Sequence, residues 1–185
     1  MTAYTGLVTL VQLSACILGD KNRMSYDAGI SYIKNVLEAT KTLLKNPNDL
    51  DARGIIMMGA SLSTSSRIGI GKEEAYAYDI YELEFLPEKL FGSSYRRSLT
   101  SIFPRFLEAM GKRHAEDVGK YYLDVFGFDS SIEESSRKLV ALFSDFGVDM
   151  YYDGIINREQ VGCIPCDTEL DENEIFEMIN GVIRK

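Results

Sequence analysis

Histidine, proline and cysteine are scarce in this chain of 185 residues, and each scarcity limits the metal sites, folds or disulfides that the chain can form. With a single histidine, the chain cannot build a metal site from several imidazole ligands. Four prolines are few for this length and suit a helical protein. Three cysteines, an odd number, argue against a disulfide framework and favour a reducing, cytoplasmic setting.

The chain also has fewer positive than negative residues, and it has no long apolar run. Lys and Arg total 20 against 28 Asp and Glu, which gives a net charge of −8 and predicts neither a nucleic-acid partner nor an anionic membrane surface. No run approaches the roughly 20 apolar residues that a membrane span needs. The 45% hydrophobic content nevertheless supports a real core, and the length predicts one domain over residues 1–185.

Helical periodicity recurs along the chain, whereas alternating strand patterns are scarce. An apolar stripe from Tyr26 to Leu44 predicts a helix with Ser25 as its N-cap and Pro47 beyond its end. About seven such segments are found and no β-α-β unit, so we predict an all-α, multi-helix bundle.

Cap signals mark three further helix starts. They lie at residues 48–51, at residues 129–131 and at the pair Asp171 and Glu174. The least regular segment, residues 147–168, is predicted to be a loop with a short helix.

The first helix is apolar nearly all round, in residues 6–18. Its Leu13-Ser14-Ala15-Cys16 stretch has the outline of a lipoprotein cleavage box, but no Lys or Arg precedes it, as a signal peptide normally requires. We therefore expect a buried first helix, with one side left bare as an interface.

The glycine string at residues 67–72, RIGIGK, is followed by Glu73 rather than Ser or Thr. It therefore fails as a phosphate-binding loop and is predicted to be a connection between helices.

Four segments together resemble a known family. They are KTLLKNPNDLDARGIIMMGAS at 41–61, RIGIGKEEAYAYDIYELE at 67–84, a helix with an internal proline at 95–104, and KRHAEDVGKYYLDVFGFD at 112–129. The order is similar to the C-terminal helical domain of the iron-containing, group III alcohol dehydrogenases, especially the butanol-dehydrogenase-like branch. The resemblance implies the helical bundle of the dehydroquinate synthase-like fold. In that family an N-terminal domain binds the nicotinamide cofactor, and the resemblance implies that this chain lacks that domain.

The family's helical domain holds its metal with three histidines, two of them four residues apart on one helix face. The resemblance places those ligands at Tyr81, Phe85 and Tyr95, none of which is histidine. An alternative register, two residues away, gives Asp79, Leu83 and Ser93. The fourth family ligand, an aspartate, has its nearest counterparts at Thr5 and Gly6. We therefore expect no metal site, no cofactor-binding residue and no catalytic residue.

Charged residues near these positions have simpler interpretations. Asp79, Glu82, Glu84 and Glu88 offer oxygens to a hard cation, but a solvated acidic face is expected in so acidic a chain. Arg96-Arg97 is expected to form a surface ion pair, or else to hold an anion.

The only histidine, His114, is expected to face solvent at a charged helix start.

The pair Cys163 and Cys166 has the spacing of a redox dithiol, and a helix start just after it would lower a thiol pKa. No thioredoxin-like β-α-β setting surrounds it, and a zinc site would have only the distant Cys16 and His114 to add. We expect incidental loop cysteines.

Three functional hypotheses follow. The preferred one is a degenerate, non-catalytic relative of the dehydrogenase helical domain that binds or regulates through self-association, as a homodimer, or through a partner chain. The alternative is the helical subunit of a split NAD(P)-dependent alcohol dehydrogenase whose nucleotide domain is on another chain. The second alternative is a dithiol redox protein using Cys163 and Cys166.

Overall fold

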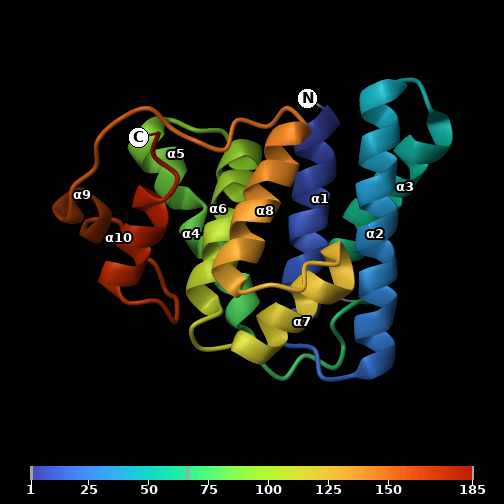
Figure 1. The fold of residues 1–185 in the computed structure, drawn as a ribbon, viewed down its shortest axis with the longest axis horizontal. Coiled ribbons are helices and arrows are strands. Elements are labelled where there is room, and N and C mark those ends of the chain that lie inside the picture. The colour runs from blue at the N-terminus through green and yellow to red at the C-terminus, as the bar shows by residue number, and fades with distance from the viewer. Residues whose placement is uncertain (1, 66, 185) are drawn as a thin grey trace.

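The computed structural model describes residues 2–65 and 67–184, and this part of the chain is a bundle of helices (Figure 1). The helices are α1 Thr2–Ile17, α2 Arg23–Lys45, α3 Leu50–Ser63, the 3-10 helix η1 Tyr76–Asp79, α4 Ile80–Leu83, α5 Phe85–Phe91, α6 Tyr95–Met110, α7 Ala115–Phe126, α8 Ile132–Asp145, α9 Arg158–Gly162 and α10 Glu172–Asn180. Within these residues only two isolated β-bridges occur and no strand forms, so the predicted all-α class is confirmed. Short helices such as α4 and α9 raise the count above the predicted seven.

Helix α1 lies at the centre of the bundle, where α2, α3 and α6 pack against it (Figure 1). Every residue from 6 to 18 except Gln12 is buried, and Leu7 and Leu10 are fully so. The expectation that one side of this helix is bare is therefore wrong, because other helices of the same chain cover it. Gly6 allows α2 close, since a Cβ there would lie 2.0 Å from the Thr40 hydroxyl oxygen.

The helix starts show which cap predictions were sound. Asp49 accepts a hydrogen bond from the Ala52 N–H at 2.9 Å, and Ser131 caps α8. Asp171 and Glu174 form the reciprocal capping box of α10, as predicted.

The predicted N-cap Ser25 is wrong. Asn22 caps α2 by accepting the Ser25 N–H at 3.1 Å, and the helix begins at Arg23. The Ser25 hydroxyl instead accepts the Gly69 N–H at 3.1 Å and so fastens the loop of residues 67–72 to α2. This loop connects α3 to η1, as predicted.

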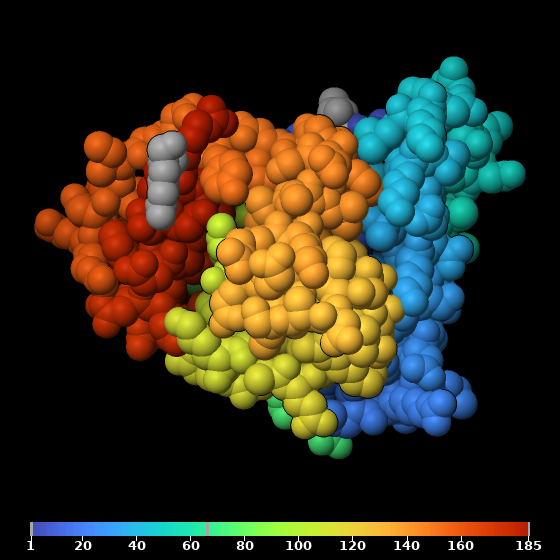
Figure 2. All heavy atoms as spheres, viewed as in Figure 1, coloured from blue at the N-terminus to red at the C-terminus, as the bar shows by residue number. Residues whose placement is uncertain are grey.

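The C-terminal segment gathers at one end of the molecule, far from α2 and α3 (Figures 1 and 2). Residues 147–157 lead there as a loop, and the predicted short helix is α9. Tyr152 anchors the loop: its ring stacks on Phe91 at 4.7 Å between centroids, and its hydroxyl lies 2.9 Å from the hydroxyls of Ser93 and Ser101. No helix in the described ranges has the length and apolar character of a membrane span.

Candidate functional site

The segment that carries the family's ligand positions is divided between two short helices, α4 and α5, and the start of the longer helix α6. Helix α4 ends at Leu83, α5 begins at Phe85, and α6 begins at Tyr95. Pro87 lies in the first turn of α5, where a missing N–H is tolerated. Glu84 retains helical backbone angles between α4 and α5, so Tyr81 and Phe85 still share a helix face.

Aromatic rings gather at these positions. The Tyr78 and Tyr81 rings stack with centroids 6.3 Å apart, and the Tyr95 hydroxyl accepts a hydrogen bond from the Gln12 side chain at 3.2 Å. Burial raises the pKa of Tyr81, with added effects from Cys16, Tyr95 and Tyr78. We call Tyr78, Tyr81, Phe85 and Tyr95 the aromatic face, and three of its rings are substantially exposed: Tyr78 by 42%, Phe85 by 45% and Tyr95 by 38%.

This donor set does not fit iron or zinc. A phenylalanine ring offers no donor, and a tyrosine with a raised pKa stays neutral and is a poor ligand. No group of three His, Cys, Asp or Glu side chains in the described part of the chain is arranged to hold a metal ion.

The alternative register fits no better. Asp79 accepts the Glu169 N–H at 2.8 Å, Leu83 is fully buried, and the Ser93 hydroxyl lies against Tyr152. The Thr5 carbonyl, at a counterpart of the fourth ligand, accepts the Thr9 hydroxyl within α1.

Among the acidic residues that were predicted to face solvent, Glu84 differs most from the prediction. It is 4% exposed, and its Oε2 has no hydrogen-bond partner among the described residues. Burial raises its pKa to about 7, and the nearby charge of Glu88 adds to the effect. The sequence held one signal for this position: Glu84 lies four residues after Ile80, which is fully buried on the same helix face. Glu82 is exposed, as predicted.

A cluster next to the aromatic face was not foreseen. The Lys72 ammonium donates to the Ala15 carbonyl near the end of α1 and lies 3.8 Å from the centroid of the Tyr78 ring. Burial lowers the pKa of Lys72 to about 8. The Cys16 thiol is 6% exposed and donates to the Ser63 carbonyl at 3.4 Å, and burial raises its pKa. The ammonium caps the C-terminal end of α1, which gives Lys72 a structural role.

Arg97 forms the predicted ion pair, with Asp149 as its partner. The two charged groups are 2.8 Å apart, and the guanidinium lies 4.4 Å from the centroid of the Tyr152 ring. The contact joins α6 to the loop that leads to the C-terminal segment.

His114 does not face solvent as predicted. Its ring stacks on Tyr76 with 3.9 Å between centroids, and 17% of the side chain is exposed. The Nδ1 atom is 3.0 Å from Glu74, and the Nε2 atom is 2.9 Å from Glu169. His114 therefore links the loop before η1 to the loop before α10, an arrangement that depends on contacts distant in sequence.

Cys163 and Cys166 are free thiols at the C-terminal end of α9, and α10 begins only at Glu172. The expected helix start directly after them is therefore wrong. Burial raises the pKa of Cys166, with a contribution from Glu82. The raised pKa reduces the thiolate fraction of Cys166, and no helix begins directly after the two cysteines to lower a thiol pKa. Neither the pKa nor a helix start therefore activates the pair.

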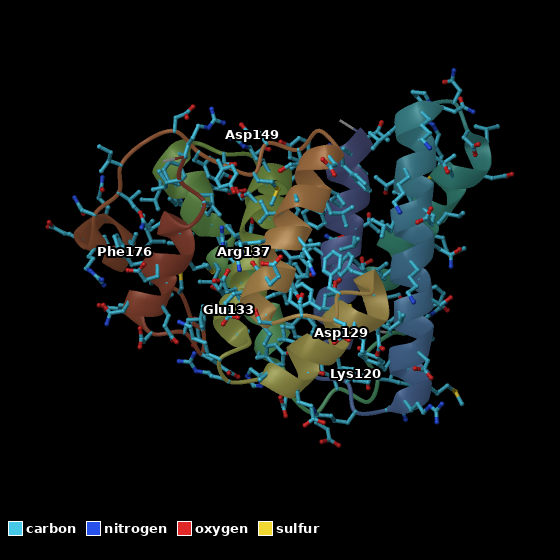
Figure 3. The ribbon with its side chains drawn as sticks, in the orientation of Figure 1. Lys120, Asp129, Glu133, Arg137, Asp149 and Phe176 are labelled. Atoms are coloured by element: carbon cyan, nitrogen blue, oxygen red, sulfur yellow. The ribbon has the colours of Figure 1, made fainter. Side chains whose placement is uncertain are left out.

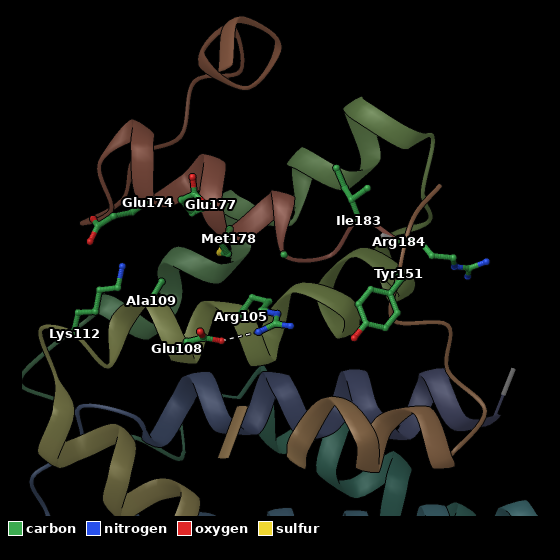
Figure 4. Close-up of a pocket in the computed structure, with 11 residues that line it drawn as sticks. Arg105, Glu108, Ala109, Lys112, Tyr151, Glu174, Glu177, Met178, Ile183 and Arg184 are labelled. Carbon is green, nitrogen blue, oxygen red and sulfur yellow. Dashed lines mark hydrogen bonds and ion pairs between the residues drawn. The ribbon is translucent and has the colours of Figure 1, made fainter. Parts of the chain in front are cut away.

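A groove of about 610 Å³ lies between α6 and the C-terminal segment (Figure 4). Several of its charged side chains are paired within the protein. Arg105 contacts Glu108 at 2.8 Å, as the dashed line in Figure 4 marks, and Glu174 contacts Arg113 at 2.6 Å. These four charges are compensated by one another and do not call for a ligand.

Comparison with family models finds no match, and comparison with curated proteins finds none either. Solved structures do match. The NADH-dependent butanol dehydrogenase A of Thermotoga maritima matches with a TM-score of 0.81 and 13% identity, over 98% of this chain and 52% of that one. The iron-containing alcohol dehydrogenase of Corynebacterium glutamicum matches with a TM-score of 0.64 and 14% identity, over 99% and 52%. The aldehyde reductase YqhD of E. coli matches with a TM-score of 0.67 and 14% identity, over 81% and 41%.

These likenesses establish the fold. The bundle is that of the helical domain of iron-containing alcohol dehydrogenases, as the resemblance predicted. The chain spans about half the length of the butanol dehydrogenase that it matches.

Proposed function

We propose that this chain is a non-catalytic module with the fold of the dehydrogenase helical domain, and that it acts by binding, through self-association or through a partner chain. The observation that carries the proposal is the composition of the aromatic face. Tyr81, Phe85 and Tyr95 stand where the resemblance expects metal ligands, and they offer no imidazole nitrogen. Hydride transfer to or from an alcohol in that family depends on a polarised oxygen, which these side chains do not provide.

The same face is suited to binding another protein. Its partly exposed tyrosine and phenylalanine rings present apolar area with polar edges, a composition that is enriched at protein interfaces. Ring stacking between Tyr78 and Tyr81 and the hydrogen bond to Tyr95 restrain three of the rings, so less conformational entropy is lost when these rings enter an interface.

The non-catalytic role is tested by an assay of cofactor oxidation. The purified chain, supplied with Fe²⁺ or Zn²⁺, NADH or NADPH and a series of aldehydes, is expected to leave the reduced cofactor unchanged. Steady oxidation of the cofactor with substrate would refute the non-catalytic proposal.

The binding role is tested by sedimentation velocity and by affinity purification from the native host. We expect a dimer or a stoichiometric partner, and we expect the double variant Phe85→Ser and Tyr95→Ser to lose it. The matched control is Tyr32→Ser, because Tyr32 is 38% exposed on α2, away from the aromatic face. Equal loss in the control, or a wild-type chain that remains alone in both assays, would contradict the proposed face.

The second candidate is the helical half of a two-chain NAD(P)-dependent alcohol dehydrogenase. The fold likeness to a protein described as an NADH-dependent dehydrogenase favours it, since this chain covers about half of that structure. The expected result is a copurifying chain with a dinucleotide-binding fold, and cofactor oxidation by the pair but by neither chain alone. A copurifying chain without nucleotide affinity would leave only the first proposal.

A further inference from the structure

His114 is the only histidine of the chain, and each nitrogen of its ring contacts a carboxylate. The Nδ1 atom lies 3.0 Å from Glu74 Oε2, and the Nε2 atom lies 2.9 Å from Glu169 Oε2. We call these three side chains the His114 junction. An ionised carboxylate only accepts hydrogen bonds, so each contact needs an N–H on the ring. A neutral imidazole carries one N–H and the imidazolium carries two, so only the protonated ring makes both contacts.

The ring is held in this orientation by Tyr76. The two rings stack with 3.9 Å between centroids and 7° between planes, and Tyr76 is 1% exposed. The Tyr76 hydroxyl donates to Asp117, which also accepts the Gly19 N–H at 2.7 Å. Loss of the second ring proton therefore leaves a nitrogen lone pair facing a carboxylate, and this repels one side of the junction.

Glu74 is also held by contacts that do not involve the histidine. Lys21 approaches its Oε1 atom at 3.7 Å, and the N–H of the neighbouring Glu73 donates to the Gly19 carbonyl at 3.1 Å. The segment before η1 therefore keeps its place when the ring is neutral, and the side of the junction that yields is Glu169.

The loop of residues 163–171 carries Glu169 and lies against η1 and α4. The Glu169 N–H donates to Asp79 of η1 at 2.8 Å, and the Cys166 thiol donates to the Glu82 carbonyl of α4 at 3.9 Å. The loop therefore borders the aromatic face, since η1 and α4 carry two of its rings.

Arg113 attracts the same end of the molecule at every pH. It contacts Glu174 of α10 at 2.6 Å and acts on Glu169 over a longer distance. A guanidinium stays protonated in proteins, so this attraction is constant. Helix α10, which Phe176 marks in Figure 3 at the end of the molecule away from α2, thus stays attached, and the loop before it is the part that can loosen.

We propose that the His114 junction is a pH-dependent fastening of the loop of residues 163–171. The imidazolium ring holds the loop against η1, and loss of one ring proton releases Glu169 and increases opening of the loop beside the aromatic face. This inference does not depend on the function proposed above.

Amide hydrogen exchange of the full chain between pH 5.5 and 8.5 tests the proposal. This range contains the pH at which histidine ordinarily changes charge. Protection factors correct for the intrinsic effect of pH on exchange and report local opening. We expect protection of the loop to fall about tenfold to a hundredfold, the range for a lost hydrogen bond to a charged group. The fall should follow the protonation of the ring, which nuclear magnetic resonance reports without ambiguity because the chain has one histidine.

Three variants separate the junction from other titrating groups. In Glu169→Gln the new amide can donate to the ring nitrogen that lacks a proton, so the loop should stay protected at pH 8.5. Glu172→Gln makes the same change at an exposed position of α10 and should keep the wild-type pH dependence. His114→Gln removes the titrating ring, and any pH dependence that remains there belongs to Glu84 or Lys72, whose pKa values are about 7 and about 8.

Several results would overturn the proposal. They are loop protection that is constant while the ring titrates, a ring that does not titrate in this range, Glu169→Gln losing protection at the same pH as wild type, and the full wild-type pH dependence in His114→Gln. Should circular dichroism show that His114→Gln is unfolded, the comparison of Glu169→Gln with Glu172→Gln decides, and equal behaviour of the two counts against the fastening.

Discussion

Helices α1 and α3 are both rich in apolar residues, yet α1 is buried and α3 is largely exposed. Helix α1 is covered by α2, α3 and α6, whereas α3 lies at the edge of the bundle (Figure 1) and exposes Leu50 by 80% and Met57 by 73%. Only Ala52, Ile56 and Gly59 of α3 are buried. Apolar content therefore shows that a helix has surface to bury, while the topology decides how much of that surface is covered.

The largest change in stability is expected from a substitution at the centre of α1. Leu10→Ala removes a fully buried side chain between three helices, and we expect the free energy of unfolding to fall by about 2–5 kcal/mol. Denaturant titration followed by circular dichroism measures the change. A loss below 1 kcal/mol, on the order of a surface substitution, would contradict the central position of α1.

A glycine pair sharpens the contrast, because one substitution should have opposite signs in the two helices. A Cβ at Gly6 in α1 would lie 2.0 Å from the Thr40 hydroxyl oxygen, so Gly6→Ala is expected to cost about 1–3 kcal/mol. Gly54 in α3 has open space around its Cβ position, and Gly54→Ala is expected to stabilise by about 0.5–1 kcal/mol. Both values come from the same denaturant titration.

The double variant Gly6→Ala and Thr40→Ala provides the control. Removing the Thr40 hydroxyl and methyl groups should recover part of the loss, and the double-mutant cycle gives the coupling. Additive effects of the two substitutions would mean that the close approach of α1 and α2 is not the cause.

Glu84 provides a similar contrast for an acidic side chain, because it was predicted to face solvent and is buried in the structure. Its pKa is raised from 4.5 to about 7, so the folded state holds a proton that the unfolded chain has lost above pH 4.5. This contribution to stability is fully present below pH 4.5 and is lost as the pH rises through 7. Glu84→Gln should therefore match wild type at pH 4 and be more stable by about 3 kcal/mol at pH 8.

Unfolding of both proteins at the two pH values measures the difference. Glu82→Gln, at an exposed position nearby, is the control and should keep the wild-type pH dependence. The same pH dependence in Glu84→Gln and wild type would show that Glu84 is not the group that titrates.

Local signals predicted much of the fold because they depend on neighbours in sequence. The caps at Asp49, Ser131 and Asp171 involve N–H groups two or three residues away, and each lies within a predicted cap signal. Ser25 was misassigned because its hydroxyl bonds to Gly69, which is 44 residues distant. A capping signal is reliable when the side chain has no competing partner, and sequence alone does not reveal such a partner.

The site was less accessible to sequence reasoning for the same reason. The absence of histidine at Tyr81, Phe85 and Tyr95 is visible in the sequence, but the partners of His114 and Lys72 are not. His114 contacts Glu74 and Glu169 across 40 and 55 residues of chain. Burial of a polar side chain is a property of the assembled bundle, so it emerges only once the helices are placed.

The smallest expected effect lies on the outer face of α3. Met57 and Met58 are 73% and 62% exposed, and replacing both with glutamine should change the free energy of unfolding by no more than about 0.5 kcal/mol per site. Denaturant titration at low and high protein concentration measures it, with Leu10→Ala as the reference for a covered position. A larger loss that grows with protein concentration would show that a second copy covers α3, because the dimer interface then contributes to stability by mass action. In that event the contrast between α1 and α3 would describe only the single chain, and both helices would be buried in the assembly.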